Sequence, residues 1–515
     1  MSHGAESAIH APIVESYLTN PSAGINDIPF GCLGKHVLLE SAAMSLPPVT
    51  PKEETPPQCL GEFRPVDQWQ AHLNTLFYGL QGDRLRDYSQ TMASGDYRLA
   101  HALAENFYMD HRTRQDLPAM IVVHEWGAGN GNLAACFLSH LKILDTAGDL
   151  YSRVQYCLID NKLDLLRVAL THPDLQAHRA QVCAMQADVQ DLSGFKDNSV
   201  HWIVSNELWS DLPTKVMLRK EGEVLEEQMR PNLSAEKTKQ YQDWFGLVKD
   251  FGTMDLDRLR NQRPFLEDII WEKDYQPVEW KRVPYRKTIA DFLKPIEELV
   301  LVPVNLGAFA TMTEAKRLLQ RGGRFISFDA GTPDLEIIGD PDKPCYSLRG
   351  GQYTFIVNFA LCKTVAERLN LEAVSVEPQK EFVARQLGKN VLTLPELLNT
   401  YPFPGKLKAW ERDRLILRTL EALSSVYSSP YRRAIDFPIR PDVPETERAD
   451  MIRMMHDLSS HAIPDNTAYL TEDEVLATLP ALESLGFSKV GIQELLGGSS
   501  AVPPCIDYYL FSFVA

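Results

Sequence analysis

The 515-residue sequence lacks a hydrophobic run long enough to cross a membrane: its longest apolar stretch, residues 299–310, falls far short of the ~20 residues that a spanning helix needs. The N-terminus has neither the basic leader and apolar segment of a secretory signal nor the Arg-rich pattern of a mitochondrial presequence. The eight cysteines show no Cys-x-x-Cys spacing, and several lie in apolar runs, where reduced buried thiols are the ordinary case. We therefore expect a soluble, cytoplasmic protein with no membrane partner.

Basic residues are also few. The balance of 52 Lys and Arg against 69 Asp and Glu gives a net charge of −17, which argues against a nucleic-acid partner and is compatible with a cationic substrate. The thirteen histidines contain no His-Glu-x-x-His motif, and the chain has neither a Gly-x-Ser-x-Gly elbow nor a Walker lysine. The sequence thus predicts no metal site, no nucleophilic serine elbow and no P-loop.

Short apolar runs alternate with amphipathic segments after Pro118, a pattern typical of βαβ units and a parallel sheet. We expect an α/β core with a mostly parallel, Rossmann-like sheet, helices on both faces, and strands at residues 120–124, 154–159, 181–186, 200–205, 299–302 and 324–328. Residues 1–116 are expected to form an N-terminal arm with helices, residues 117–388 the core, and residues 389–515 a helical extension with a terminal strand. That strand either joins the main sheet as its antiparallel edge or belongs to a separate helical module.

The most informative stretch is the run Ile-Val-Val-His-Glu-Trp followed by Gly-Ala-Gly-Asn-Gly at residues 121–131. A β-branched run closed by Gly-x-Gly lets a ligand approach the backbone at a helix N-terminus. For a dinucleotide the third glycine, Gly131, comes one place early. An acid before Gly-x-Gly-x-Gly is similar instead to the first motif of class I S-adenosylmethionine methyltransferases, where that acid helps to hold the methionine ammonium group. This similarity assigns to the cofactor Glu125, Gly127, Ala128, Gly129 and Asn130; the alternative is a glycine turn that binds nothing.

Acids also close the next two expected strands, and ligands of open α/β sheets bind outside such carboxyl ends. Asp160 can accept hydrogen bonds from both ribose hydroxyls of an adenosine, with a helix N-cap as its alternative role. Asp188 can accept from the adenine amino group, although an acid in a polar loop explains it equally well. With their neighbours Asn161 and Val189, these residues complete the adenosine side of the predicted site.

The fourth expected strand is followed by Asn-Glu-Leu-Trp-Ser-Asp-Leu-Pro at residues 206–213. We expect Asn206 on the cofactor side. If Glu207 begins a helical turn, Glu207 and Asp211 share one face at i, i+4 and can converge on a cation; a surface turn is the alternative. Two acids in a ligand crevice are costly to leave without a partner, so we expect both to act in catalysis.

Taken in order, these segments resemble the MidA-like S-adenosylmethionine-dependent methyltransferases, a family that includes the mitochondrial complex I assembly methyltransferase, which modifies a protein arginine. The resemblance covers about residues 94–388 and also uses residues 322–331, 351–359 and 378–388. It implies S-adenosylmethionine as cofactor. Ala330, Tyr353 and Asn358 depart from the family pattern on the side that faces the substrate there, so the cofactor carries over better than the acceptor.

Residues 218–298 form an insertion much longer than the usual 2–6 residues of such connections. The segment is charged, rich in aromatic residues and helical in pattern. We expect a cap that selects the acceptor, with a packing subdomain as the alternative.

The sequence therefore predicts a methyltransferase in which Glu207 clamps the acceptor and accepts its proton, supported by Asp211. The acceptor is a protein arginine or, alternatively, a small biosynthetic intermediate. A non-catalytic assembly factor that keeps the cofactor pocket for stability is a third hypothesis. A homodimer is left open.

Overall fold

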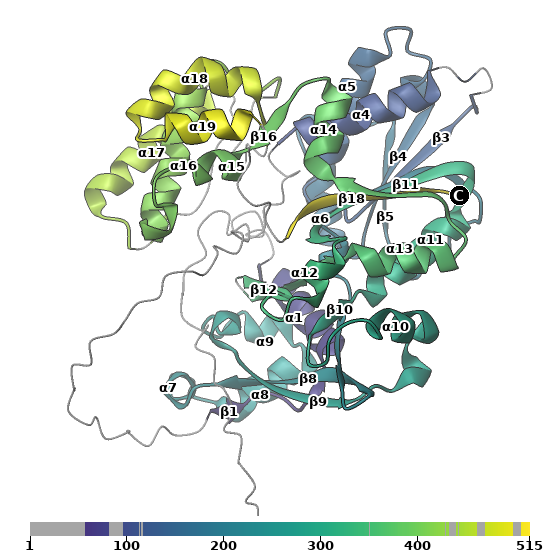
Figure 1. Cartoon of the computed structure of the whole chain (residues 1–515), viewed down its shortest axis with the longest axis vertical. Helices are drawn as coiled ribbons and strands as arrows, with labels where there is room; N and C mark the ends of the chain where they lie inside the picture. The colour runs from purple at the N-terminus through teal and green to yellow at the C-terminus, as the bar shows by residue number, and fades with distance from the viewer. Residues whose placement is uncertain are drawn as a thin grey trace, which may run out of the picture.

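The computed structural model describes residues 57–81, 96–112, 114, 117–349, 351–427, 429–431, 439–440, 442–460, 469–497 and 506–515. Most of the expected N-terminal arm, and Ser94 and Gly95 of the family resemblance, lie outside the described residues. The described chain forms a large sheet covered by helices, a second sheet below it in Figure 1, and a group of C-terminal helices at its side.

The main sheet has the strand order β15-β18-β11-β6-β3-β4-β5, with the short β14 (Val357–Asn358) beside β11. Its strands are β3 (Ile121–Trp126), β4 (Val154–Asp160), β5 (Val182–Gln186), β6 (Val200–Asn206), β11 (Leu319–Thr332), β15 (Glu372–Pro378) and β18 (Asp507–Val514). The strands from β5 to β11 run parallel, whereas β18 is antiparallel to both of its neighbours. Because helices cover both faces, the central strands are apolar runs rich in Val and Ile. The expected mostly parallel, Rossmann-like α/β sheet is confirmed.

Two expectations about single strands need correction. The apolar run at residues 299–302 does not enter the main sheet, because β10 (Val302–Val304) pairs antiparallel with β7 (Lys215–Lys220) in the second sheet. Hydrophobicity indicates that such a run is buried but not which sheet it joins. The terminal strand β18 does join the main sheet, but it lies between β11 and β15 and not at the edge.

Two helical layers cover the main sheet (Figure 1). On one face lie α4 (Arg98–His111), α5 (Asn132–Leu144), α6 (Leu163–Leu170) and α14 (Gln379–Leu387). On the other face lie α11 (Leu306–Leu318) and α13 (Phe359–Arg368). Phe107 and Phe137 pack against Trp202 on the first face, and Phe325 packs against Trp126 on the second.

The second sheet is antiparallel and combines the inserted segment with the N-terminal residues. Its strands are β1 (Gln58–Cys59), β2 (Arg64–Pro65), β7, β8 (Glu223–Leu233), β9 (Ile270–Pro277) and β10. It is packed by α1 (Val66–Gln81), α8 (Trp244–Thr253), α9 (Leu256–Leu259) and the hairpin β12 (Tyr346–Arg349)/β13 (Gln352–Phe355). The helical pattern expected for residues 218–298 is therefore wrong for β8 and β9, although α7 (Ala235–Thr238), α8, α9 and α10 (Arg286–Leu293) lie in the same segment.

The C-terminal group packs against α4 and α14, two of the helices that cover the first face of the main sheet. It contains α15 (Leu394–Asn399), α16 (Ala409–Leu423), α17 (Glu445–Ser460), α18 (Glu472–Ser484), α19 (Lys489–Leu496) and the paired strands β16 (Val391–Thr393) and β17 (Tyr469–Thr471). Glu474 in the capping box of α18 forms a bidentate pair with the buried Arg98 of α4, at 2.6 and 3.0 Å. None of the helices in the described ranges has the length and apolar character of a bilayer span.

Candidate functional site

The strand order reverses between β3 and β6, because the chain runs outward from β3 through β4 to β5 and then returns to the other side of β3. In a sheet of this kind the crevice at such a reversal is where ligands bind. The register places Trp126 opposite both Ile159 and Ser205, and Phe328 opposite Asn206. The carboxyl ends of β3, β4, β6 and β11 therefore meet at one edge of the sheet.

The glycine loop connects β3 to α5 by a sharp turn. Gly127, Gly129 and Gly131 have φ values of +74°, +51° and +79°, a backbone region that favours glycine. A Cβ on Gly131 would lie 3.0 Å from the backbone of Ala169, so this glycine permits close helix packing. A Cβ on Gly129 would meet nothing within 4 Å, so its backbone borders open space. Ala128 is buried, and the Asn130 side chain accepts a hydrogen bond from the backbone N–H of Asn132 at 3.0 Å.

Glu125 is the buried acid at the end of β3. Its Oε2 accepts a hydrogen bond from the Tyr156 hydroxyl at 2.8 Å. Burial, with a smaller contribution from the charge of Asp160, raises the pKa of Glu125 to about 8 although the Tyr156 hydrogen bond lowers it. A cation placed beside this group would favour its ionised form.

The two predicted adenosine acids differ in their surroundings. Asp160 is buried at the end of β4, and its Oδ1 accepts from the backbone N–H of Lys162 at 2.9 Å. Burial raises the pKa of Asp160. Asp188 is exposed after β5, and its Oδ1 accepts from the backbone N–H of Gln190 at 2.9 Å, as in an Asx turn. Asn161 is exposed and Val189 is buried.

Glu207 follows β6 in a constrained conformation. Glu207 has φ +49°, which is uncommon outside glycine, and its backbone N–H donates to the Phe328 carbonyl at 2.7 Å. The helical turn begins only at Trp209 (η4, Trp209–Asp211), so the expected i, i+4 helical face of Glu207 and Asp211 does not form. The Oδ1 of Asn206 is buried and has no hydrogen-bond partner among the described residues.

Asp211 lies half-buried at the end of η4, and neutral side chains surround its carboxylate. Tyr78 donates its hydroxyl hydrogen to Oδ2, and the Nε2 of Gln352 donates to Oδ1 at 2.9 Å and to Oδ2 at 3.0 Å. Burial raises the pKa of Asp211 to about 6, while the hydrogen bonds from Tyr78 and Gln352 lower it. A carboxylate with such a pKa is mostly ionised at neutral pH and still able to exchange a proton.

Sequence reasoning missed three residues of this edge: Tyr78, Asp329 and Gln352. The buried Asp329 lies in the Phe-Asp-x-Gly run of β11, directly after the strand expected at residues 324–328, and its Oδ2 accepts from the backbone N–H of Ser210 at 3.0 Å. Burial, with a contribution from the charge of Asp211, raises its pKa to about 7. Its place at a strand end was a usable signal. Tyr78 and Gln352 carry no local signal, since their contacts with Asp211 span 133 and 141 residues.

The Tyr78 hydroxyl marks where the carboxylates come together. Its pKa lies well above the usual range because of burial and then because of the charges of Asp211, Asp160 and Glu207. Acids from η4 and from the ends of β4 and β6 thus act electrostatically on one hydroxyl group, whereas Asp188 is exposed. In the part of the chain that the structure describes, no three His, Cys, Asp or Glu side chains are placed to hold a metal ion.

The model of a protein family described as "Putative S-adenosyl-L-methionine-dependent methyltransferase" matches residues 99–354, which span the strands β3 to β11 and the whole carboxylate-lined edge. The chain belongs to this family. It is an S-adenosylmethionine-dependent methyltransferase, and the expected cofactor is confirmed.

Two solved structures similar to this methyltransferase come from Burkholderia thailandensis. One, bound to S-adenosyl-homocysteine, has 12% sequence identity over 88% of this chain and 88% of that chain, with a TM-score of 0.45. The other, an uncharacterized protein of the same superfamily, has 13% identity over 88% of this chain and 87% of that chain, with a TM-score of 0.42. No curated protein matches the chain.

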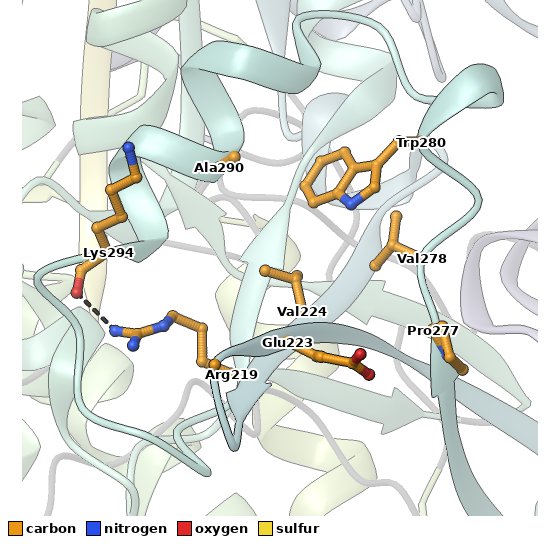
Figure 2. A pocket seen from close by; sticks show the side chains of 9 residues that line it. Arg219, Glu223, Val224, Pro277, Val278, Trp280, Ala290 and Lys294 are labelled. Atoms are coloured by element: carbon orange, nitrogen blue, oxygen red, sulfur yellow. Dashed lines mark hydrogen bonds between the residues drawn. The ribbon is translucent and has the colours of Figure 1, made fainter.

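The methyltransferase also has a cavity of about 570 Å³ in its second sheet, between the β7–β8 turn, the end of β9 and α10 (Figure 2). It is lined by Arg219, Gly222, Glu223, Val224, Pro277, Val278, Trp280, Ala290 and Lys294. The Nη1 of Arg219 is held by the Lys294 carbonyl at 2.6 Å. None of the strand-end residues described above lines this cavity, so it is separate from the crevice.

Proposed function

We propose that this methyltransferase acts on a nitrogen of a cationic acceptor, an arginine side chain of a protein, in the crevice between β3 and β6. The observation that carries the proposal is the Asp211 carboxylate: it is half-buried, its pKa is about 6, and its side-chain partners Tyr78 and Gln352 are neutral. A half-buried carboxylate without a cationic partner favours a ligand that brings a positive charge.

The cofactor side of the crevice fits S-adenosylmethionine. The backbone of Gly129 borders open space. The Asn206 Oδ1 is buried and has no hydrogen-bond partner among the described residues. Burial of such an oxygen costs free energy unless a ligand donates a hydrogen bond to it. We assign to the cofactor Glu125, Gly127, Ala128, Gly129, Asn130, Asp160, Asn161, Asp188, Val189 and Asn206. When bound, S-adenosylmethionine supplies a methyl group on a positively charged sulfonium.

We assign to Glu207 the contact with the acceptor. A guanidinium group has a pKa above about 12 and loses a proton as its nitrogen attacks, so a carboxylate that both clamps and accepts is the natural helper. The left-handed backbone of Glu207 and its bond to the Phe328 carbonyl fix where this side chain starts. Asp211 holds a second N–H group of the acceptor. Orientation of this kind contributes several kcal/mol to a displacement reaction.

Mass spectrometry of a lysate and of an arginine-containing peptide library, each incubated with methyl-labelled S-adenosylmethionine, tests the acceptor class. We expect label on protein arginine. Label confined to a small metabolite would overturn the protein acceptor and favour the biosynthetic alternative.

The substitution Glu207→Gln tests the assigned proton acceptor. We expect cofactor affinity to stay within a few-fold while turnover falls about 100-fold, the contribution typical of a general base. Glu221→Gln is a matched control, because Glu221 is also a glutamate at positive φ (+52°) but lies exposed in the β7–β8 turn. If no acceptor is ever labelled and Glu207→Gln cells behave like wild type while a Gly129 variant does not, the non-catalytic assembly factor is the better explanation.

A further inference from the structure

The acceptor side of the crevice is completed by a helix that packs on the other sheet. We propose that Tyr78 of α1 is a positioning residue for methyl transfer: its hydroxyl, together with the amide of Gln352, holds the Asp211 carboxylate toward the acceptor. This inference rests on the proposed role of Asp211 in binding the acceptor.

Helix α1 presents a row of polar side chains to the segment that carries Asp211. Gln70, Asn74 and Tyr78 are spaced i, i+4, i+8 and therefore lie on one face of the helix. The side chain of Gln70 donates to the Ser210 carbonyl at 3.0 Å and accepts from the Thr214 N–H at 2.8 Å. Asn74 donates to the Asp211 carbonyl at 3.3 Å. The row follows residues 210–214 and ends at the Asp211 carboxylate.

The same row ties down the hairpin that supplies Gln352. The amide of Asn74 donates to the Tyr353 carbonyl at 3.0 Å and accepts from the Tyr353 N–H at 2.9 Å. Next to it, the Nε2 of Gln352 donates to the Tyr78 hydroxyl at 3.0 Å and to both oxygens of Asp211. Helix α1, the β12/β13 hairpin and η4, which are far apart in the sequence, thus meet at the Asp211 carboxylate. Tyr78 and Gln352 donate hydrogen bonds, and Asp211 accepts them.

The packing of α1 does not need the Tyr78 hydroxyl. The adjacent face of the helix buries Trp69, Leu73, Leu76 and Phe77 in the core of the second sheet, whereas Tyr78 is only partly buried. Removal of one hydroxyl leaves that apolar face intact. Its direct effect falls on Asp211, which loses a donor that lowers its pKa.

Other ionisable groups face this cluster from neighbouring elements. Glu207 and Asp160 act on Tyr78 from the ends of β6 and β4, and Asp329 at the end of β11 couples to Asp211. All three are acids, so none of them brings a positive charge to Asp211, and burial raises the pKa of Asp211. The donors Tyr78 and Gln352 oppose that effect and keep the carboxylate ionised.

The test compares Tyr78→Phe with the wild-type full-length chain. We expect cofactor affinity by calorimetry to be unchanged within two-fold, kcat to fall roughly tenfold, and the acid limb of the kcat profile to move up by about one pH unit, because the carboxylate has lost a donor. An infrared pH titration of the carboxyl, identified with Asp211→Asn, should show the same upward shift without any methyl transfer.

Tyr275→Phe is the matched control, since it removes a hydroxyl that donates to the buried Glu227 in the same second sheet at 3.2 Å. We expect it to leave kcat and the acid limb unchanged. A Tyr78→Phe enzyme with wild-type kcat and an unmoved acid limb, or a Tyr275→Phe enzyme with the same losses, would overturn the inference and leave the proposed function intact. A wild-type chain that binds cofactor but transfers no methyl group would instead overturn the proposed function.

Discussion

Gly129 and Gly148 have similar backbone conformations but lie in different parts of the molecule. Both have positive φ, +51° and +73°, and in both cases an added Cβ would meet nothing within 4 Å. Gly129 lies at the crevice between β3 and β6, whereas Gly148 lies in the turn between α5 and β4. The pair therefore separates the strain of a side chain at positive φ from the loss of space for a ligand.

We predict that Gly129→Val abolishes S-adenosylmethionine binding, because the side chain occupies the space assigned to the cofactor. Gly148→Val carries a similar backbone penalty of about 1–2 kcal/mol but should bind the cofactor like wild type. Calorimetric titration of both variants measures the difference. Equal affinities of Gly129→Val and wild type would place the cofactor elsewhere.

At the scale of single residues, the sequence predicted the positions that local chemistry marks. Glu125, Asp160 and Asn206 were found because each ends an apolar run, and the structure has each at the end of its strand. The backbone conformation of Glu207 was not predictable in the same way. The i, i+4 spacing of Glu207 and Asp211 suggests a helix that begins at Glu207, but Glu207 has a φ of +49° and the helical turn begins only at Trp209. The contacts between Tyr78, Gln352 and Asp211 arise only from the tertiary fold.

Among the elements, the second sheet joins the acceptor side of the crevice through α1. Strand β8 is its centre, because β1, β2, β7 and β9 all pair with it. The helix α1 lies against β8 and β13, so the position of its polar row depends on the inserted segment. The insertion therefore forms this part of the molecule together with β1, β2 and α1, which precede the main sheet in sequence, and with β10 and the β12/β13 hairpin, which follow the insertion.

We predict that replacing residues 218–298 with a short Gly/Ser link preserves S-adenosylmethionine binding and eliminates methyl transfer. The link can close, because Met217 and Val302 are paired neighbours in the sheet. Glu125, Gly129 and Asp160 stay on the main sheet, whereas α1 loses β8. Calorimetry and a labelled-methyl assay measure the two effects. A shortened protein that methylates the same acceptor at the same rate would show that the insertion only packs.

Helices and strands were predictable from the sequence where the hydrophobic pattern fits only one type of secondary structure. The β-branched runs of β3, β4 and β6 indicate buried parallel strands. Strands β8 and β9 are half-exposed and charged, with Glu-Val-Leu-Glu-Glu-Gln and Ile-Trp-Glu-Lys-Asp-Tyr runs that also fit an amphipathic helix. The partner strands β1 and β2, which lie outside the insertion and pair with β8, decide between the two.

Across the whole molecule, burial of acids at the crevice links stability to pH. Glu125, Asp329 and Asp211 have pKa values raised to about 8, 7 and 6. The folded chain therefore holds protons that the unfolded chain has released above about pH 4–5. The stability that these groups contribute is present below that range and lost as the pH rises through 6, 7 and 8. His72, His111 and His124, with pKa values lowered to about 4, act in the opposite sense, but only below about pH 6.5.

We predict that the cofactor-free protein loses a few °C of Tm between about pH 6.5 and 8.5, and that Glu125→Gln loses less. The variant should also be more stable than wild type at the higher pH, because the side chain at position 125 no longer has to ionise. Scanning calorimetry at low and high pH measures both. A wild-type Tm that rises over this interval would contradict the assignment.

The position of β18 has a consequence for how the chain is made. In the main sheet, β18 lies between β11 and β15 and pairs with both. Strand β15 ends at residue 378 and β18 begins at residue 507, which is 129 residues later. During synthesis at about 5–20 residues per second, both edges wait at least several seconds for their partner. Over that time the nascent chain exposes the unpaired edges of β11 and β15, which is the state that chaperones bind and that aggregates in their absence.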